Sequence, residues 1–417
     1  MRYFLLTIGL LLITTGSATG TTYVVSPDGT GDFPTIQAAI DSVLDGDIIE
    51  LANGMFTGEG NRDIDYLGKA ISIRSQAGDP DSCLIGCAYS ARGFIFHSGE
   101  GHDSILEGVT IAYGYAGYEE VGGGILCSAS SPSIVNCVVR NCTALRGGGI
   151  RIEDSESAPH IDGCTIDSNS ADLSGGGISA YGSLTLTNCT IIDNTTAEHG
   201  GGASLHGTPV VRNCTFVGNS GINAIAYGFP EPVTFQGVIV AFSFEGKAMC
   251  STLSPDVTPT LICCDLFANP GGDWVDQIAD QYGVLGNISE DPLFCDLEAR
   301  DLTLHEDSPC APFTPPNPGC DLIGAYPVGC APMAVPVTPA PPAPFLNPAA
   351  PNPFTGATLI RYSVPTGERG AVALSVCDAT GRLVRTLIDG PQAPGRHAVQ
   401  WDGTAHDGRQ APAGVYF

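Results

Sequence analysis

Basic residues are scarce in this sequence: 17 Lys and Arg stand against 44 Asp and Glu, for a formal net charge of −27. Nucleic acid binding needs clustered Lys and Arg at the phosphates, so this balance excludes nucleic acid as a partner. It favours cation binding, basic partners or a solvated acidic surface. Charged residues are only 15% of 417, whereas 54 residues are glycine and 43% are hydrophobic. That composition is too apolar for a disordered chain and too glycine-rich for a helical bundle.

Long hydrophobic runs are also rare. The single run, residues 4–15, follows Arg2 and is followed by small residues up to Gly20. A basic start, a short apolar stretch and small residues are typical of a secretory signal peptide, here residues 1–20. The run is too short for a comfortable membrane span. We therefore expect a secreted or cell-surface protein with no transmembrane segment in the mature chain.

Helical periodicity is missing from the central region, which excludes ankyrin, tetratricopeptide and HEAT arrays. What is present is a repeat: glycine triplets begin at 122, 147, 175 and 200, at intervals of 25, 28 and 25 residues. Four cysteines keep step with the triplets, namely Cys137, Cys164, Cys189 and Cys214. A fixed period of this length indicates a repeat architecture. Short alternating segments such as SLTLTNCTII between these landmarks predict strands.

Several short strands in each repeat predict one coil of a parallel β-helix. Equivalent residues should then stack in ladders along the axis, and one apolar ladder comprises Ile134, Ile161, Leu186 and Val211. Asn188 and Asn213 should bond along the stack at a left-handed turn. Earlier coils are expected at residues 47–51, 70–75, 93–98 and 105–114. Before them, Thr35 precedes a helical pattern that extends to Leu44, and this helix should cover the open apolar end.

The residues from SPDGTGDFPTIQAAIDSVLDGDIIEL through the NC…N…GGGI coils to DLIGAY carry a resemblance. They resemble secreted bacterial right-handed parallel β-helix repeat proteins of the pectin-lyase-like fold, over about residues 22–330. The GGGI and NCTF pattern also resembles repeats of polymorphic outer-membrane adhesins. The resemblance implies an all-β fold for residues 21–330, with capping segments, and says little about activity.

Residues 331–352 are rich in Pro and Ala and predict an extended, semi-rigid linker. Residues 353–417 contain alternating segments separated by DATG and DG turns, which predict a small antiparallel sandwich. This stretch resembles the Ig-like domain of flagellar hook-capping proteins and the sorting domains of type IX secretion. The resemblance implies contact with secretion or anchoring machinery. The family pattern continues beyond GVYF, so this domain is expected to be truncated.

A catalytic signature is missing as well. The opening DGTGDFPTIQAAID is similar to that of pectin methylesterases, but their downstream Gln-Asp and Asp-Phe-Ile-Phe-Gly stretches are not present. Alignment on the glycine triplets places Ser128, Glu153, Tyr181 and His206 in one outward column, with Arg151 on the same face. Basic, acidic and aromatic groups together are suited to a sugar-binding groove. The alternative is the ordinary polar exterior of a solenoid.

Other candidates are individually weaker. Asp167 and Asp193 fall on neighbouring coils, where two carboxyls could form a glycosidase pair or simply cap turns. Asp154 and Glu156, in the loop that lengthens one coil, could bind calcium weakly or form a solvated acidic loop. Arg146 is assigned to a corner that faces water. No cofactor is required by any of these patterns, and calcium is the one candidate ion.

Sixteen cysteines need an account in an exported protein. Those at equivalent core positions are expected to be buried, reduced and inert. The loop-rich stretch before the linker contains Cys295, Cys310, Cys320 and Cys330, where crosslinks are expected, with three pairings open. No CxxC or Cys/His spacing suggests zinc.

Two classes of function remain. The first is a secreted or surface β-helix that binds glycans or surfaces without catalysis, or serves as a structural element of an envelope layer. The second is a polysaccharide lyase or glycoside hydrolase that uses the column around Arg151. We favour the first. A convergent pair of titratable groups in a cleft would separate the two.

Overall fold

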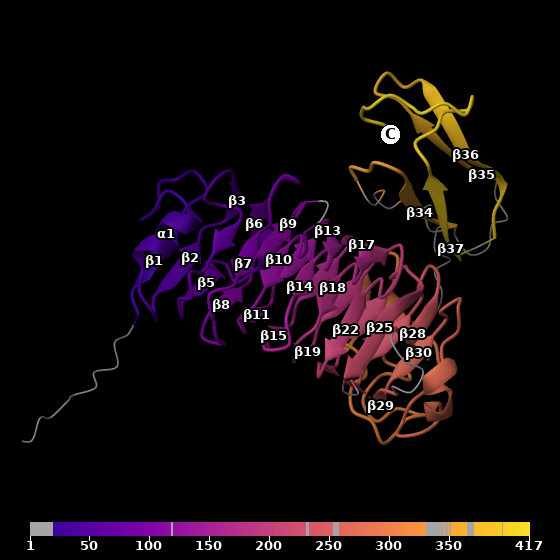
Figure 1. The fold of residues 1–417 in the computed structure, drawn as a ribbon. Coiled ribbons are helices and arrows are strands. Elements are labelled where there is room, and N and C mark those ends of the chain that lie inside the picture. The colour runs from indigo at the N-terminus through magenta and orange to yellow at the C-terminus, as the bar shows by residue number, and fades with distance from the viewer. Residues whose placement is uncertain are drawn as a thin grey trace, which may run out of the picture.

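The computed structural model describes residues 20–117, 120–230, 233–252, 258–330, 346, 349, 352–364, 371–393 and 395–417. The expected signal peptide and most of the expected linker lie outside these residues. Figure 1 shows a long parallel β-solenoid, followed by a separate smaller C-terminal domain beside its far end. Within the described part of the chain, no helix has the length and hydrophobicity needed to span a bilayer.

Three parallel sheets form the walls of the solenoid, and each complete coil adds one strand to each sheet. Sheet A comprises β1 (Thr22–Val25), β2 (Ile48–Leu51), β5 (Ser72–Ser75), β8 (Ile105–Glu107), β11 (Ser133–Val135), β15 (His160–Asp162), β19 (Thr185–Thr187), β23 (Val210–Arg212), β26 (Thr234–Gln236) and β29 (Thr260–Ile262). Sheet B comprises β3 (Gly54–Thr57), β6 (Cys83–Gly86), β9 (Thr110–Ala112), β12 (Val138–Arg140), β16 (Thr165–Asp167), β20 (Thr190–Ile192), β24 (Thr215–Val217), β27 (Ile239–Ala241) and β30 (Asp265–Phe267).

Sheet C closes the coil with β4 (Ile64–Asp65), β7 (Phe94–Phe96), β10 (Ile125–Cys127), β14 (Ile150–Ile152), β18 (Ile178–Ala180), β22 (Ala203–Gly207), β25 (Asn223–Pro230) and β28 (Lys247–Ser251). A short sheet of β13 (Thr143–Arg146), β17 (Ser170–Ser174) and β21 (Thr195–Thr196) connects sheets B and C in the central coils. Strands occur at all the earlier coils expected from the sequence.

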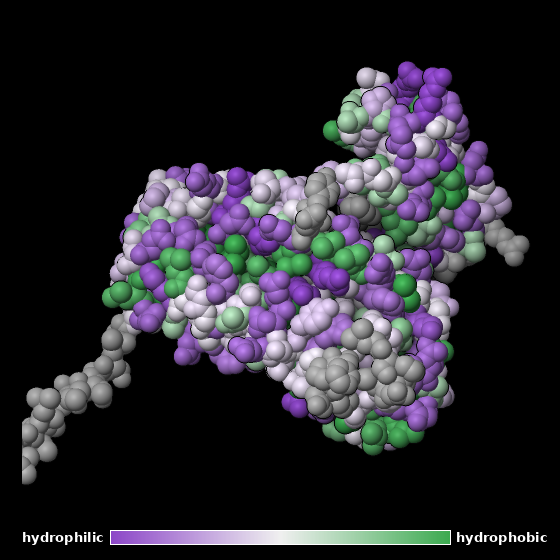
Figure 2. Space-filling view, in the orientation of Figure 1, coloured by the Kyte–Doolittle hydropathy of each residue, from purple (hydrophilic) through white to green (hydrophobic). Residues whose placement is uncertain are grey.

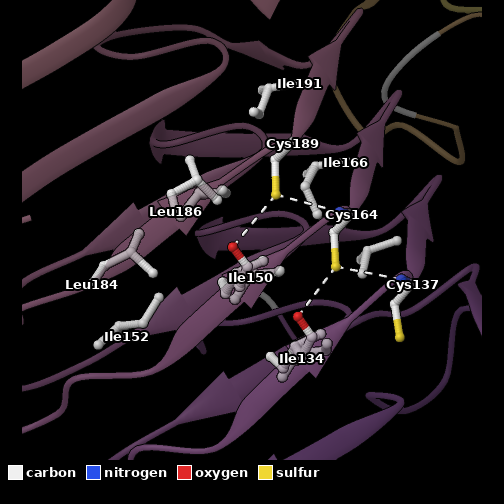
Figure 3. Close-up of a cluster of buried hydrophobic side chains, with 14 of the residues drawn as sticks. Ile134, Cys137, Ile150, Ile152, Cys164, Ile166, Leu184, Leu186, Cys189 and Ile191 are labelled. Atoms are coloured by element: carbon white, nitrogen blue, oxygen red, sulfur yellow. Dashed lines mark hydrogen bonds between the residues drawn. The ribbon is translucent and has the colours of Figure 1, made fainter. Parts of the chain in front are cut away.

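The predicted apolar ladder is confirmed. Ile134 pairs with Ile161, Ile161 with Leu186, and Leu186 with Val211, and all four are fully buried. The cysteines form a second ladder, in which the backbone N–H of Cys137 donates to Cys164 Sγ at 3.4 Å and that of Cys164 to Cys189 Sγ at 3.3 Å (Figure 3). All four are free thiols, and burial raises the pKa of Cys137, Cys164 and Cys189. The cysteines therefore act as small buried apolar residues, as expected.

The asparagine ladder differs from the prediction. Asn188 and Asn213 do adopt left-handed turns, with φ of 53° and 48°, and Asn188 Nδ2 donates to Asp162 Oδ1 at 2.8 Å. The stacked ladder inside the coil is made instead by Asn169, Asn194 and Asn219. These side chains satisfy backbone groups at the corner after sheet B, where the chain turns and ordinary strand pairing stops.

The N-terminal cap agrees with the prediction except at its end. Helix α1 (Ile36–Ser42) buries Ile36, Ala39 and Ile40 against the first coil, and Thr35 Oγ1 accepts from the Ala38 N–H at 3.2 Å. The prediction extended the helix to Leu44, which is wrong: the helix ends before Val43, and Leu44 is 74% exposed. A short 3₁₀ helix, η1 (Pro80–Ser82), precedes β6.

At the other end, residues 268–330 form a C-terminal cap that includes η2 (Asp276–Gln281), β31 (Phe294–Asp296), β32 (Asp301–His305) and β33 (Val328–Cys330). Part of this cap folds back over the outer face of sheet B, where Leu302 packs with Ile192 and Val217. One disulfide, Cys295–Cys330, crosslinks the cap, and a second, Cys263–Cys320, joins the cap to the last coil of the β-helix. Of the four cysteines expected to form crosslinks, Cys310 is therefore a free thiol, and Cys320 pairs with a residue outside the set.

The C-terminal domain consists of two antiparallel pairs: β34 (Thr358–Val364) with β37 (Gly395–Trp401), and β35 (Ala371–Cys377) with β36 (Leu383–Pro391). Trp401 is buried between them and contacts Phe354 and Tyr416, with ring centroids 5.4 and 5.0 Å away. The buried Trp401 ring and its two aromatic neighbours thus form a small core within this domain.

Replacing Gly176 with Ala should destabilise the solenoid by about 2 kcal/mol, because its added Cβ would overpack the corner. That Cβ would lie 2.3 Å from the Thr195 carbonyl oxygen and 2.5 Å from that of Gly201, both backbone atoms of the next coil. Gly101→Ala is the matched control, since no atom lies within 4 Å of its added Cβ. Chemical denaturation of the two variants checks this. Equal stabilities would show that the coils can separate to accept a methyl group.

Candidate functional site

Arg151, in the middle of β14, is the most unusual side chain on the outer face of sheet C. It stands in register with Ser179 on β18 and, one coil further, Ser204 on β22. Although it points outward, Arg151 is only 6% exposed. Its Nη1 donates to Ser179 Oγ at 2.7 Å, and its buried Nε has no partner among the described residues. A buried charged group with an unused donor is costly unless something else satisfies it.

The predicted column of Tyr181 and His206 lies directly beside this arginine. Arg151 Cζ lies 4.6 Å from the centre of the Tyr181 ring, which is a cation–π contact. On its other side, the Tyr181 ring stacks on His206 with centroids 4.8 Å apart and planes 11° from parallel. Strand register explains the arrangement: Ala180 on β18 pairs with Leu205 on β22, so the residues that follow them, Tyr181 and His206, lie on neighbouring coils in the same column. The structure thus brings together three of the four residues predicted to bind.

Glu153 and Ser128, the remaining members of the column, take no part in the stack. Glu153 is exposed and Ser128 is half-buried. Glu153 acts on Arg151 only electrostatically, since its charge raises the pKa of that arginine. The acidic member of the column therefore lies at the solvent edge of the site.

His206 is buried to almost the same extent as Arg151, with 7% of its surface exposed. Its Nε2 lies 3.3 Å from Ser204 Oγ, and its Nδ1 has no partner among the described residues. Burial lowers the pKa of His206, and the charges of Arg151 and Arg146 lower it further. The imidazole is therefore favoured in its neutral form, beside two arginines.

Arg146 belongs to the same basic cluster, and the sequence interpretation missed it. It is half-buried, its Nη1 donates to Ser174 Oγ at 3.2 Å, and its charge lowers the pKa of Arg151. Burial is the main cause that lowers the pKa of Arg151. Two neighbouring arginines in a chain of net charge −27 form a local site of positive potential.

On the N-terminal side of this cluster, the outer face of sheet C becomes apolar. Ile95 on β7 pairs with Leu126 on β10, which pairs with Arg151, and both apolar side chains are half-buried. Figure 2 shows hydrophobic residues that gather over β7 and β10 between hydrophilic neighbours. The face therefore offers an apolar strip that leads to buried positive charge.

Comparisons with known proteins agree with this architecture. The family model of the right handed beta helix region matches residues 59–183 and 99–237, and the model of the FlgD Ig-like domain matches residues 353–417. Residues 59–237 are a right-handed β-helix, and residues 353–417 are a FlgD-type Ig-like domain.

Solved structures with a similar fold include pectate lyase Pel9A, with a TM-score of 0.46 and 15% identity over 60% of this chain and 70% of the lyase. The pectin methylesterase of Aspergillus niger has a TM-score of 0.38 and 13% identity over 66% and 98% of the two chains. The pectin methylesterase from carrot has a TM-score of 0.37 and 12% identity over 69% and 93%. No curated protein sequence matches the chain. At these identities and TM-scores, the likenesses carry no inference about activity.

Asp167 and Asp193 of the β-helix both bind Arg300. Arg300 of the C-terminal cap donates through Nη1 to Asp167 Oδ2 at 2.8 Å and through Nη2 to Asp193 Oδ2 at 2.6 Å. Asp193 is buried, and desolvation raises its pKa against the effect of Arg300. The carboxyls do lie close together, as considered from the sequence. They hold the cap onto the β-helix from the edge of sheet B.

In the loop of the long coil, Asp154 is an internal hydrogen-bond acceptor. Its Oδ1 accepts from the backbone N–H of Ser157 at 2.9 Å and that of Glu156 at 3.1 Å, and its Oδ2 accepts from Ala129 N. Glu156 is exposed. Among the described residues, no group of three or more His, Cys, Asp or Glu side chains is placed to hold a metal ion.

Proposed function

We propose that this protein is a non-catalytic β-helix that binds an acidic polysaccharide on the outer face of sheet C. Arg146, Arg151, Tyr181 and His206 form the binding residues. The observation that carries the proposal is the buried guanidinium of Arg151, which lies over Tyr181 with its Nε unpaired. The secreted or cell-surface location expected from the N-terminus would place this face among extracellular glycans.

An anionic sugar fits this site better than a neutral one. A carboxylate accepts strong, charge-assisted hydrogen bonds from a guanidinium, and its negative charge would compensate the buried cation of Arg151 and the half-buried cation of Arg146. Tyr181 is 38% exposed, and its edge and hydroxyl provide the accessible border of the cluster. The half-buried side chains of Ile95 and Leu126 offer an apolar surface for the next sugar ring along the strip.

Binding is favoured over cleavage because the buried imidazole is poorly placed to act as a base. Abstraction of a proton requires a base within hydrogen-bond reach of the substrate. His206 is mostly buried, and Tyr181 covers one face of its ring. The carboxyls of Asp167 and Asp193 lie at sheet B, away from this face, and both are bound to Arg300 of the cap. Polysaccharide cleavage remains the alternative that the same experiment would detect.

Arg151→Met should weaken binding of polygalacturonate or alginate at least tenfold, because the charge-assisted hydrogen bonds would be lost. Arg212→Ala is the matched control, since it removes an equal charge from an exposed position on sheet A. Calorimetry on the full chain, with and without calcium, would compare these acidic polymers with a neutral glucan.

Equal weakening by Arg151→Met and Arg212→Ala would reduce the effect to net charge and contradict the assigned site. Failure of the unsubstituted chain to bind any acidic polymer would reject the proposed function. Unsaturated products or new reducing ends during the same incubations would overturn its non-catalytic part. Compared with Arg151→Met, the variant Arg151→Lys should restore part of the affinity, because lysine keeps the positive charge but lacks the paired donors of the planar guanidinium.

A further inference from the structure

The Ig-like domain contacts the β-helix through one face of its β34–β37 pair. Arg361 lies opposite Ala398, and Ser363 lies opposite Arg396, so all four side chains share that face. Arg361 is only 2% exposed, although it belongs to a surface strand of a small domain. Its burial comes from the flank of the β-helix.

On the β-helix side, both arginines make cation–π contacts with the ring of Phe244. The Cζ atoms of Arg361 and Arg396 lie 5.1 and 5.7 Å from the centre of its ring. Arg396 Nη1 also lies 3.9 Å from Asp193 Oδ1, so the same aspartate faces the cap on one side and the Ig-like domain on the other. An aromatic ring beside a carboxylate is a surface that arginine recognises well.

This contact is specific in geometry but incompletely satisfied. Nε and Nη2 of Arg361, Oδ1 of Asp193 and Oγ of Ser363 are buried without a hydrogen-bond partner in the described structure. Burial is the main cause that lowers the pKa of Arg361 and of Arg396, and the charge of Asp193 offsets part of that effect. Unpaired buried polar atoms make a contact less stabilising. Domains that are not joined by a large apolar interface are expected to move relative to one another.

We propose that the arginine face of the Ig-like domain, defined by Arg361 and Arg396, is a reversible docking face that rests on Phe244 and Asp193 of its own β-helix. In the docked state, this face is unavailable to other molecules. After release, it would present two adjacent arginines suited to an aromatic side chain next to a carboxylate. The inference is independent of the proposed polysaccharide binding, which lies on sheet C.

The test measures the reactivity of individual arginines in the full chain with phenylglyoxal, followed by mass spectrometry. In the unsubstituted chain, Arg361 should react at least tenfold more slowly than the exposed Arg409. Phe244→Ala leaves the Ig-like domain unaltered and should raise the reactivity of Arg361 and Arg396 and the radius of gyration in solution scattering. High salt should act in the same direction, since it screens the contact with Asp193.

Phe313→Ala is the matched control, because Phe313 is exposed on the C-terminal cap. It should leave both readouts unchanged, and melting curves would show that the β-helix of each variant stays folded. The proposal is overturned if Arg361 reacts as fast as Arg409 in the unsubstituted chain, or if Phe244→Ala leaves Arg361 protected. Protection that disappears on dilution would also overturn it, because the docking partner would then be a second copy of the chain.

Discussion

Replacing Asn194 with Leu is expected to lower the free energy of unfolding by about 4 kcal/mol, because several buried polar groups would lose their partners at once. Asn194 is fully buried. Its Oδ1 accepts from N and Nδ2 of Asn169, both at 3.0 Å, and its Nδ2 donates to the carbonyl oxygens of Ile166 and Ile192 at 2.8 and 3.1 Å. Nδ2 also lies 3.1 Å from Asn219 Oδ1, which continues the ladder.

Leucine branches at the same carbon as asparagine and is larger, so no cavity would form. The loss would come from the missing hydrogen bonds, and overpacking would add to it. Asn53→Leu is the matched control, because Asn53 is exposed, and it should change stability by no more than about 0.5 kcal/mol. Guanidinium denaturation followed by circular dichroism would compare the two variants. A loss at Asn194 no larger than the one at Asn53 would mean that ordered water or local rearrangement replaces the ladder.

The same asparagines show what a repeat reveals and what it hides. The period placed Ile134, Ile161 and Leu186 in one ladder, because residues that recur at a fixed interval must stack when each interval is one coil. It did not distinguish Asn188 from Asn194, since both recur with the period. Which asparagine points inward depends on the corner, where Asn188 takes φ of 53° and Asn194 turns its side chain into the coil.

The sequence repeat could not predict contacts between segments that lie far apart in the chain. Arg300 binds Asp167 across 133 residues of sequence, and Cys263 reaches Cys320 because the cap folds back over the end of the β-helix. No periodicity links these segments. The candidate site follows the same rule: the stack of Arg151, Tyr181 and His206 follows strand register and was predicted. The nearness of Arg146 depends on the angle between neighbouring sheets and was missed.

The stability of the C-terminal cap should depend on pH through Asp265, which begins β30 and is fully buried. Its Oδ1 accepts from the Glu290 N–H at 3.1 Å, and its Oδ2 accepts from the Cys310 thiol at 3.2 Å. Burial raises the pKa of Asp265 to about 7 from an ordinary value of 3.8, and these two hydrogen bonds offset only part of that effect. The free thiol that the sequence interpretation assigned to a crosslink is therefore a partner of this carboxyl.

The folded state holds the proton of Asp265 more tightly than the unfolded state does. The protonated carboxyl therefore makes its full contribution to the free energy of unfolding at pH values below the pKa that Asp265 has in the unfolded chain. That contribution should be lost as pH rises from about 4 to about 7, at up to about 1.4 kcal/mol per pH unit. Asp265→Asn keeps the shape without the titration, so its stability relative to the unsubstituted chain should rise over the same interval and level off above it. The exposed Asp103→Asn is the control and should show no such trend. Denaturation midpoints at several pH values give the comparison. A constant difference between Asp265→Asn and the unsubstituted chain would mean that Asp265 is already ionised in the folded cap at pH 4.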